Sequence, residues 1–210
     1  MTKTILIILI ALFSFNLKAL SLQDLQSGDV LLLSLNCIEC RMIESETDSP
    51  FSHSGVVLID QFGRVRVAQA LTTVHDIPFE KFISNMTRGT FVHVYRPKQF
   101  AGWSDKEKEL NATIFYNLYY RNYRGLFFDS RFIWDNFDEK GNELLYCSEF
   151  IAKFLDNFLI EKTIPHLISY EKNWDYWYKL FKGDVPVGEV GNGPASFARD
   201  QRFEFKGTIQ

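Results

Sequence analysis

This 210-residue chain has no excess of basic residues: it has 23 Lys and Arg residues, 26 Asp and Glu residues and a formal net charge of −3. Proteins that bind nucleic acids usually present a basic face, so no nucleic-acid partner is expected. Internal repeats and low-complexity tracts are also lacking. The length is typical of one domain and is sufficient for a full hydrophobic core.

An apolar run long enough to cross a membrane comfortably is lacking as well. Residues 5–15 are almost all apolar, with Lys3 before them and a short polar break ending at Ala19 after them. A membrane-spanning helix needs about 20 residues, whereas the apolar core of a secretory signal peptide has about 7–15. We therefore predict a signal peptide over residues 1–19, a single mature domain over residues 20–210, and a secreted or periplasmic location. An uncleaved membrane anchor is the alternative.

Cysteine is scarce, with only Cys37, Cys40 and Cys147 in the chain. A zinc site needs about four ligands at suitable spacing, and no second Cys-x-x-Cys pair accompanies Cys37 and Cys40, so no metal site is predicted. In an oxidising compartment this pair could close a small disulfide, or it could remain as two thiols. Nothing around the pair resembles a thioredoxin-like β-α-β unit. A structural disulfide, or a loop that covers an active site, is therefore favoured over a redox pair. Cys147 has no partner in this scheme.

Short apolar segments bounded by turn residues predict β-strands. Their length and composition place strands at residues 30–33, 55–60, 64–71 and 90–95. A three-residue turn joins the second and third of these, so they are predicted to form a hairpin. The polar segment 36–50 is predicted to be a loop with at most one helical turn, and the tail from Lys182 onward to be extended and irregular.

Two segments have the pattern of amphipathic helices, and a short helix is also predicted over residues 78–86. Ser104 and Glu107 form a capping box that predicts a helix start. A second helix is predicted to begin at Tyr146-Cys147-Ser148-Glu149. Its apolar residues recur at helical spacing, namely Phe150, Ile151, Phe154, Leu155 and Phe158. The combination predicts an α+β fold in which an antiparallel sheet packs against helices.

Cys147 stands at the start of this helix, where a thiol is chemically distinct. The helix dipole and the unpaired N–H groups of the first turn favour a thiolate, and the same N–H groups can stabilise an oxyanion. Tyr146 could add a phenolic donor near that oxyanion or bind substrate, or it could simply pack. A nucleophilic cysteine also needs a base and a group that orients the base.

His53 is the candidate base among the four histidines, because it starts an apolar strand and is flanked by Ser52 and Ser54. In the predicted hairpin, residues whose numbers sum to about 122–124 lie opposite each other, so Gln69 faces residues 53–55. The amide oxygen of Gln69 could accept the proton of one His53 ring nitrogen and thereby fix its tautomer. Gln69 could instead bond only the backbone. The other three histidines are predicted to be structural or surface residues.

Four short motifs, taken in their order and spacing, resemble the circularly permuted papain-like amidases, and in particular the YiiX-like branch of the NlpC superfamily. The motifs are Gly-Asp-Val-Leu-Leu from residue 28, Ser-Pro-Phe-Ser-His-Ser-Gly-Val-Val from 49, Val-Ala-Gln-Ala from 67 and Tyr-Cys-Ser-Glu-Phe from 146. The resemblance implies a permuted papain-like fold in which the histidine precedes the cysteine, with Cys147 as nucleophile and His53 as base. The third position is commonly acidic in this branch, whereas this chain has Gln69. That departure leaves room for a slower enzyme, or for another group such as Glu149 to assist.

Together, these features predict an exported cysteine hydrolase that cleaves an amide or ester bond through an acyl-enzyme. No metal or organic cofactor is required. The expected substrates are a small amide or ester, a cell-wall peptide or a lipid, near the membrane or envelope. The alternatives are an acyltransferase on the same fold, a non-catalytic envelope protein that binds a ligand, and thiol–disulfide exchange by Cys37 and Cys40.

Overall fold

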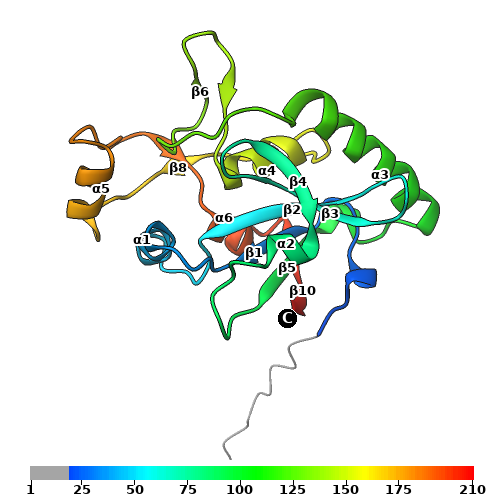
Figure 1. The fold of residues 1–210 in the computed structure, drawn as a ribbon. Helices are drawn as coiled ribbons and strands as arrows, with labels where there is room; N and C mark the ends of the chain where they lie inside the picture. The colour runs from blue at the N-terminus through cyan, green and yellow to red at the C-terminus, as the bar shows by residue number, and fades with distance from the viewer. Residues whose placement is uncertain (1–18) are drawn as a thin grey trace, which may run out of the picture.

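The computed structural model describes residues 19–210, so the predicted signal peptide lies, apart from Ala19, outside the described residues. A six-stranded antiparallel sheet, in the order β10-β5-β1-β2-β3-β4, packs against helices (Figure 1). The predicted α+β class with an antiparallel sheet is confirmed. In the described part of the chain, no helix has the length and apolar character needed to span a membrane.

The sheet collects strands from both ends of the described chain. Its members are β1 (Val30–Leu33), β2 (His53–Ile59), β3 (Val65–Ala70), β4 (Val74–Pro78), β5 (Val92–Pro97) and β10 (Phe203–Ile209). The helices are α1 (Ile38–Glu46), α2 (Phe79–Phe82), α3 (Asp105–Leu118), α4 (Cys147–Leu155), α5 (Trp174–Leu180) and α6 (Pro194–Arg199). Two small ladders pair β6 (Asn136–Phe137) with β7 (Glu143–Leu144) and β8 (His166–Leu167) with β9 (Val190–Gly191). Short 3-10 helices cover Leu22–Asp24 and Lys98–Phe100, and a π-helical turn, Tyr119–Tyr123, continues α3.

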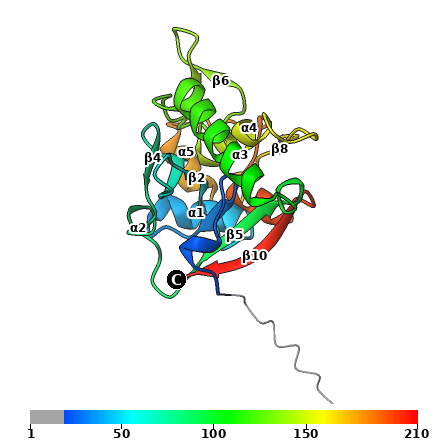
Figure 2. The same cartoon turned by 90° about the vertical axis from the view of Figure 1, so that its right-hand side faces the viewer.

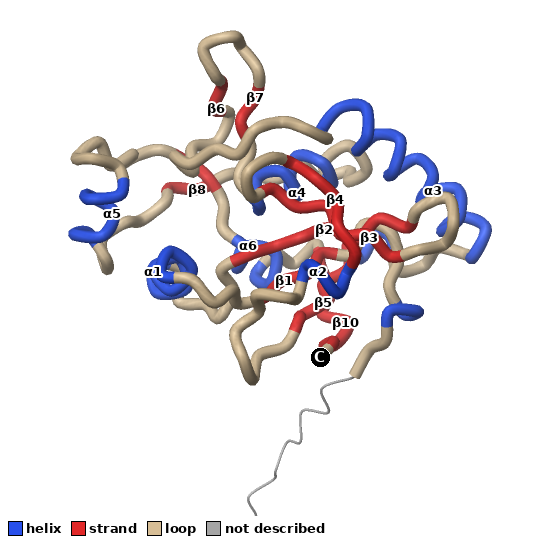
Figure 3. Tube along the Cα trace, in the orientation of Figure 1, coloured by secondary structure: helices blue, strands red, loops and turns tan. Residues whose placement is uncertain are grey.

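The central strand β1 explains why its sequence is apolar throughout. Successive side chains of a strand point to opposite faces, and both faces of β1 are covered. Val30 and Leu32 join a core with side chains of α3 and α4, whereas Leu31 and Leu33 join a second core with side chains of α2. Figures 2 and 3 show α3 and α4 together over one side of the sheet, with α2 on the other.

The β2–β3 hairpin has a register within the predicted range, since Val56 pairs with Ala68 and Ile59 with Val65. Gly55 allows the close packing of this hairpin. A β-carbon at Gly55 would lie 2.4 Å from Cγ1 of Val67 and 2.8 Å from Cε2 of Phe82. A larger residue at 55 would therefore push apart the strands that carry His53 and Gln69.

Two segments predicted to be irregular are regular in the structure, so those predictions were wrong. The segment 36–50 contains α1, whose only buried residue is Cys40, so no apolar periodicity marks it in the sequence. The tail contains α6 and β10, and β10 pairs with β5 at the edge of the sheet. The helix predicted at 78–86 is the single turn of α2, and it follows the unpredicted strand β4.

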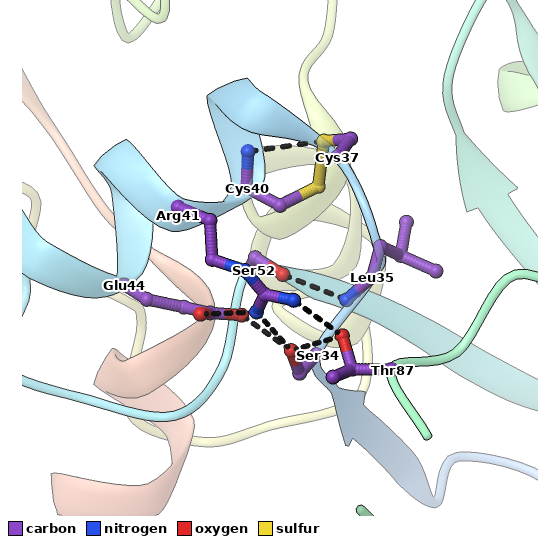
Figure 4. The surroundings of a disulfide bond; sticks show 8 residues. All are labelled: Ser34, Leu35, Cys37, Cys40, Arg41, Glu44, Ser52 and Thr87. Carbon is purple, nitrogen blue, oxygen red and sulfur yellow. Dashed lines mark hydrogen bonds and ion pairs between the residues drawn. A yellow bond between two sulfur atoms is a disulfide. The ribbon is translucent and has the colours of Figure 1, made fainter.

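Cys37 and Cys40 form a disulfide at the start of α1 (Figure 4). The Cys37 sulfur also accepts a hydrogen bond from the backbone N–H of Cys40, at 3.0 Å. Arg41 then joins α1 to the end of β1, because its guanidinium donates to the hydroxyl of Ser34. Nearby, the Leu35 N–H donates to the hydroxyl of Ser52 at 2.9 Å and so holds the chain just before His53.

Candidate active site

His53 is the first residue of β2, and its ring is buried against Gln69. Nε2 of His53 lies 2.8 Å from Oε1 of Gln69, within hydrogen-bond distance. Both side chains are only 3% exposed. The ring of Phe82, from α2, packs beside His53 with the ring centroids 5.7 Å apart. The structure therefore places the predicted base beside its predicted orienting group, in a site shielded from water.

Cys147 is the first residue of α4, which packs against β2 and β3. The residue before it, Tyr146, makes no side-chain cap, so the first-turn N–H groups of α4 lack side-chain capping. The hydroxyl of Ser54 has no hydrogen-bond partner among the described residues, and it lies near enough to the Cys147 sulfur to influence the pKa of the thiol. The sulfur also faces the backbone and hydroxyl of Ser148.

Burial keeps both predicted reacting groups neutral at rest. It raises the pKa of the Cys147 thiol, and the nearby polar groups of Ser54 and Ser148 lower this pKa only in part. Burial also lowers the pKa of His53 to about 4, although the hydrogen bond to Gln69 acts in the opposite direction. The expectation that the helix start makes Cys147 a resting thiolate is therefore wrong, because desolvation outweighs the helix N–H groups.

Within the described residues, no hydrogen bond joins the His53 ring to the Cys147 sulfur. Ser54, which follows His53 in β2, lies near the sulfur. Catalytic hydrogen bonds are often long in unliganded enzymes and shorten when substrate binds. The unliganded structure thus has a neutral imidazole at the start of β2 and a neutral thiol at the start of α4, which packs against β2.

Acid should destabilise the fold through His53. The unfolded histidine binds a proton below pH 6.5, whereas the native ring resists it down to about pH 4. Stability is therefore lost as pH falls through this window, by about 3 kcal/mol at about 1.4 kcal/mol per pKa unit. Urea unfolding at pH 7, 5.5 and 4 should show this extra loss in the wild type and not in His53→Gln. Equal losses in the two proteins would contradict the buried, neutral histidine.

A pocket of about 290 Å³ lies beside Cys147. Cys147, Ser148 and Ser52 form part of its wall, whereas His53 and Gln69 do not. The apolar and aromatic part of the wall comprises Ile43, Phe132, Tyr146, Leu167, Ile168, Tyr170, Trp177, Pro194 and Ala195. A ligand with an apolar group could therefore lie against the sulfur.

Tyr146 supports the wall of this pocket. Its phenol oxygen accepts a hydrogen bond from the backbone N–H of Asn192, at 2.8 Å. Asn192 is also tied to the nucleophile helix, because its side-chain amide donates to the Ser148 carbonyl at 3.1 Å and the Ser148 hydroxyl donates back to the Asn192 carbonyl at 3.2 Å. A β-carbon on Gly191 would lie 2.7 Å from the Tyr146 hydroxyl oxygen. Tyr146 thus holds the segment around Asn192 against the start of α4.

Glu149 is engaged elsewhere and does not assist His53. Its Oε1 accepts from the backbone N–H of Asp135 at 2.9 Å and lies 2.8 Å from Nζ of Lys153. Ser54, Ser148 and Asn192 were not predicted as site residues. Ser54 could have been found from its place beside His53, whereas Asn192 lies in a tail without any periodic signal.

No protein-family profile matches this sequence, and no curated protein matches it. Among solved structures, the chain is similar to the metalloprotein YiiX of Escherichia coli O157:H7, with a TM-score of 0.73 and 18% sequence identity. The alignment covers 87% of this chain and 97% of that one. At this identity the likeness shows a YiiX-like fold.

Proposed function

We propose that this protein is a cysteine hydrolase with a circularly permuted papain-like fold, in which Cys147 is the nucleophile and His53 the general base. The observation that carries the proposal is the hydrogen bond from Nε2 of His53 to Oε1 of Gln69. With its proton on Nε2, the ring keeps a lone pair on Nδ1. The neighbouring helix α4 begins with Cys147 beside a pocket. The order of histidine before cysteine and the YiiX-like fold also support this reading.

In the proposed reaction, the resting pair is neutral and the proton moves during attack. Nδ1 of His53 takes the thiol proton as the Cys147 sulfur bonds to the carbonyl carbon of an amide or ester. The N–H groups at the start of α4 stabilise the resulting oxyanion. His53 then protonates the departing amine or alcohol. Water, deprotonated by His53, cleaves the acyl-enzyme and restores the thiol.

The proposed substrate carries an apolar group beside its amide or ester bond, because the pocket wall is largely apolar and aromatic. A cell-wall peptide and a lipid both remain candidates. Export to the periplasm or beyond is part of the proposal. It is supported by the signal-like first 19 residues and by the disulfide between Cys37 and Cys40, since disulfides persist in oxidising compartments.

The metalloprotein YiiX raises the question of whether a metal would fit in this chain. Asp135, Glu143 and Glu149 each offer a carboxylate oxygen, and these oxygens lie within 4.8 Å of one another. The ammonium of Lys153, however, lies 2.7 Å from Asp135, 2.5 Å from Glu143 and 2.8 Å from Glu149. A cation is thus already bound to all three carboxylates. These residues do not fit a metal while Lys153 is in place, and the proposed reaction has no metal step.

The first test is the rate at which iodoacetamide alkylates Cys147 between pH 4.5 and 9.5. Transfer of the thiol proton to His53 within the pair changes no net charge, so the fraction of molecules in the thiolate–imidazolium form is constant between the pKa of His53, about 4, and the raised pKa of the thiol. Alkylation through this form has a rate that does not depend on pH. We expect a flat rate from about pH 5 to 8 in the wild type. His53→Ala should instead show a rate that rises about tenfold per pH unit, as for an isolated thiol below its pKa.

Mass spectrometry of the intact protein can follow this reaction, since Cys147 is the free cysteine of the chain and Cys37 and Cys40 are bonded to each other. Phe82→Leu is a suitable control, because it alters the packing beside His53 and leaves both reacting groups in place. A wild-type rate that rises steadily with pH, unchanged in His53→Ala, would overturn the catalytic reading. The protein would then be a binding protein with this fold.

A further inference from the structure

A neutral amide poses a problem that a carboxylate does not. Both oxygens of a carboxylate accept hydrogen bonds, whereas the side chain of Gln69 has one accepting end and one donating end. If the amide were turned over, its NH₂ group would face Nε2 of His53. The ring would then carry its proton on Nδ1, and that nitrogen could no longer take a proton from Cys147.

We propose that His75 is a positioning residue that fixes the orientation of Gln69 and, through it, the tautomer of His53. The inference rests on the proposed function for its catalytic meaning. Gln69 and His75 pair directly across strands β3 and β4. Nε2 of Gln69 lies 3.2 Å from Nε2 of His75, and Nδ1 of His75 lies 2.8 Å from the backbone oxygen of Thr73.

The donor and acceptor of each hydrogen bond in this series, from Thr73 through His75 and Gln69 to His53, follow from the Thr73 carbonyl. A carbonyl oxygen only accepts, so Nδ1 of His75 must carry a hydrogen. In the neutral ring Nε2 then has a lone pair, which accepts from the NH₂ group of Gln69. Oε1 of Gln69 is thereby turned toward His53, whose Nε2 must donate. The last free position is the lone pair on Nδ1 of His53, the atom that the proposed reaction uses as the base.

The departure of this chain from an acidic third residue gives His75 its role. With a carboxylate at position 69, either oxygen could accept the hydrogen bond from His53, so no further group would be needed to fix the orientation of that side chain. With Gln69, the choice depends on the acceptor that His75 supplies from the edge strand β4. His75 is half-buried and does not line the pocket beside Cys147, so its influence passes through Gln69.

The test is one double-mutant cycle in the full mature chain, in which His75→Phe is compared with its parent in the wild-type background and in the Gln69→Glu background. His75→Phe keeps a ring in place and removes the acceptor. Long-range ¹H–¹⁵N spectra of the histidine side chains at pH 7 should show His53 protonated at Nε2 in the wild type and a mixture of tautomers in His75→Phe. The Cys147 alkylation rate in its flat region should fall about 5- to 10-fold. In the Gln69→Glu background, His75→Phe should change this rate less than about 2-fold.

His93→Phe is the matched control, because His93 is also half-buried but contacts Phe51 and Phe205 and makes no bond to Gln69. His75→Gln keeps an acceptor and a donor, and is expected to retain the Nε2 tautomer of His53. An unchanged His53 tautomer in folded His75→Phe, or an equal loss of rate in both backgrounds, would overturn the inference. A wild type without the flat rate region but with a His75-dependent tautomer would instead refute the proposed function alone.

Discussion

Cys147→Ala is expected to lose at least about a thousandfold in hydrolytic rate, because removal of a nucleophile leaves only binding and oxyanion stabilisation. The assay would follow chromogenic N-acyl amides and acyl esters, with acyl groups of increasing length to fill the apolar pocket. With an ester that deacylates slowly, the wild type should also gain the mass of one acyl group. That adduct should map to the peptide containing Cys147.

The matched control is the double variant Cys37→Ser/Cys40→Ser. Cys37 caps α1 and Cys40 lies in its first turn. Helix α1 contributes to the pocket wall, but the two sulfurs are joined to each other and neither cysteine is among the wall residues. The double variant should keep activity within a few-fold of the wild type. The reverse result, with activity lost in the double variant and kept in Cys147→Ala, would refute Cys147 as the nucleophile, and the Cys37–Cys40 pair would then be tested for thiol–disulfide exchange.

The partnership of His53 and Gln69 could be predicted because it depends on local structure alone. A hairpin with a short turn has a fixed register, so simple addition of residue numbers places position 69 opposite positions 53–55. The observed register has pairs that sum to 124, such as Val56 with Ala68. Likewise, the start of α4 at Cys147 follows from the helical spacing of Phe150, Ile151 and Phe154.

Residues that depend on long-range packing could not be predicted in this way. Asn192 reaches the site because Tyr146, 46 residues earlier, bonds its backbone N–H. His75 was predicted to be structural or at the surface, since β4 was not predicted and its pairing with Gln69 follows from that strand. The neutral resting pair was also missed. A helix start favours a thiolate, but only the folded structure shows that burial at Cys147 outweighs this effect.

Lys153 holds together the segment that precedes the nucleophile helix. Its ammonium bonds Asp135, Glu143 and Glu149, and it lies 5.1 Å from the centre of the Trp134 ring. Glu149 is fully buried. Burial raises the pKa of Glu149 to about 7, although Lys153 acts in the opposite direction. Burial lowers the pKa of Lys153, but its three carboxylates raise it by more. Both pKa values are therefore raised. Three carboxylates around one ammonium keep Lys153 charged, whereas a single ammonium divided among three carboxylates cannot offset the burial of Glu149.

Lys153→Met is therefore expected to destabilise the fold in a manner that depends on pH. Without the ammonium, the pKa of Glu149 rises further above its value in the unfolded chain. A carboxyl group whose pKa is raised by folding lowers the stability progressively as the pH increases from the unfolded pKa to the folded pKa. Below pH 7 Glu149 is mostly protonated in both proteins, so their stabilities should differ by only about 1 kcal/mol at pH 6. At pH 9 the variant must bury an unpaired charge or retain the proton, and the difference should reach about 4 kcal/mol. Urea unfolding at the two pH values measures it.

The double variant Glu149→Gln/Lys153→Met separates this effect from lost packing, because an amide at 149 has no charge to bury at any pH. Its stability relative to the wild type should be nearly the same at pH 6 and pH 9. A cost of Lys153→Met that is equal at both pH values, or that persists at pH 9 in the double variant, would show that the lysine acts through the packing of its alkyl chain against Trp134. The pH-dependent result would instead show that the start of α4, and with it Cys147, is held by a buried carboxylate that depends on one shared ammonium.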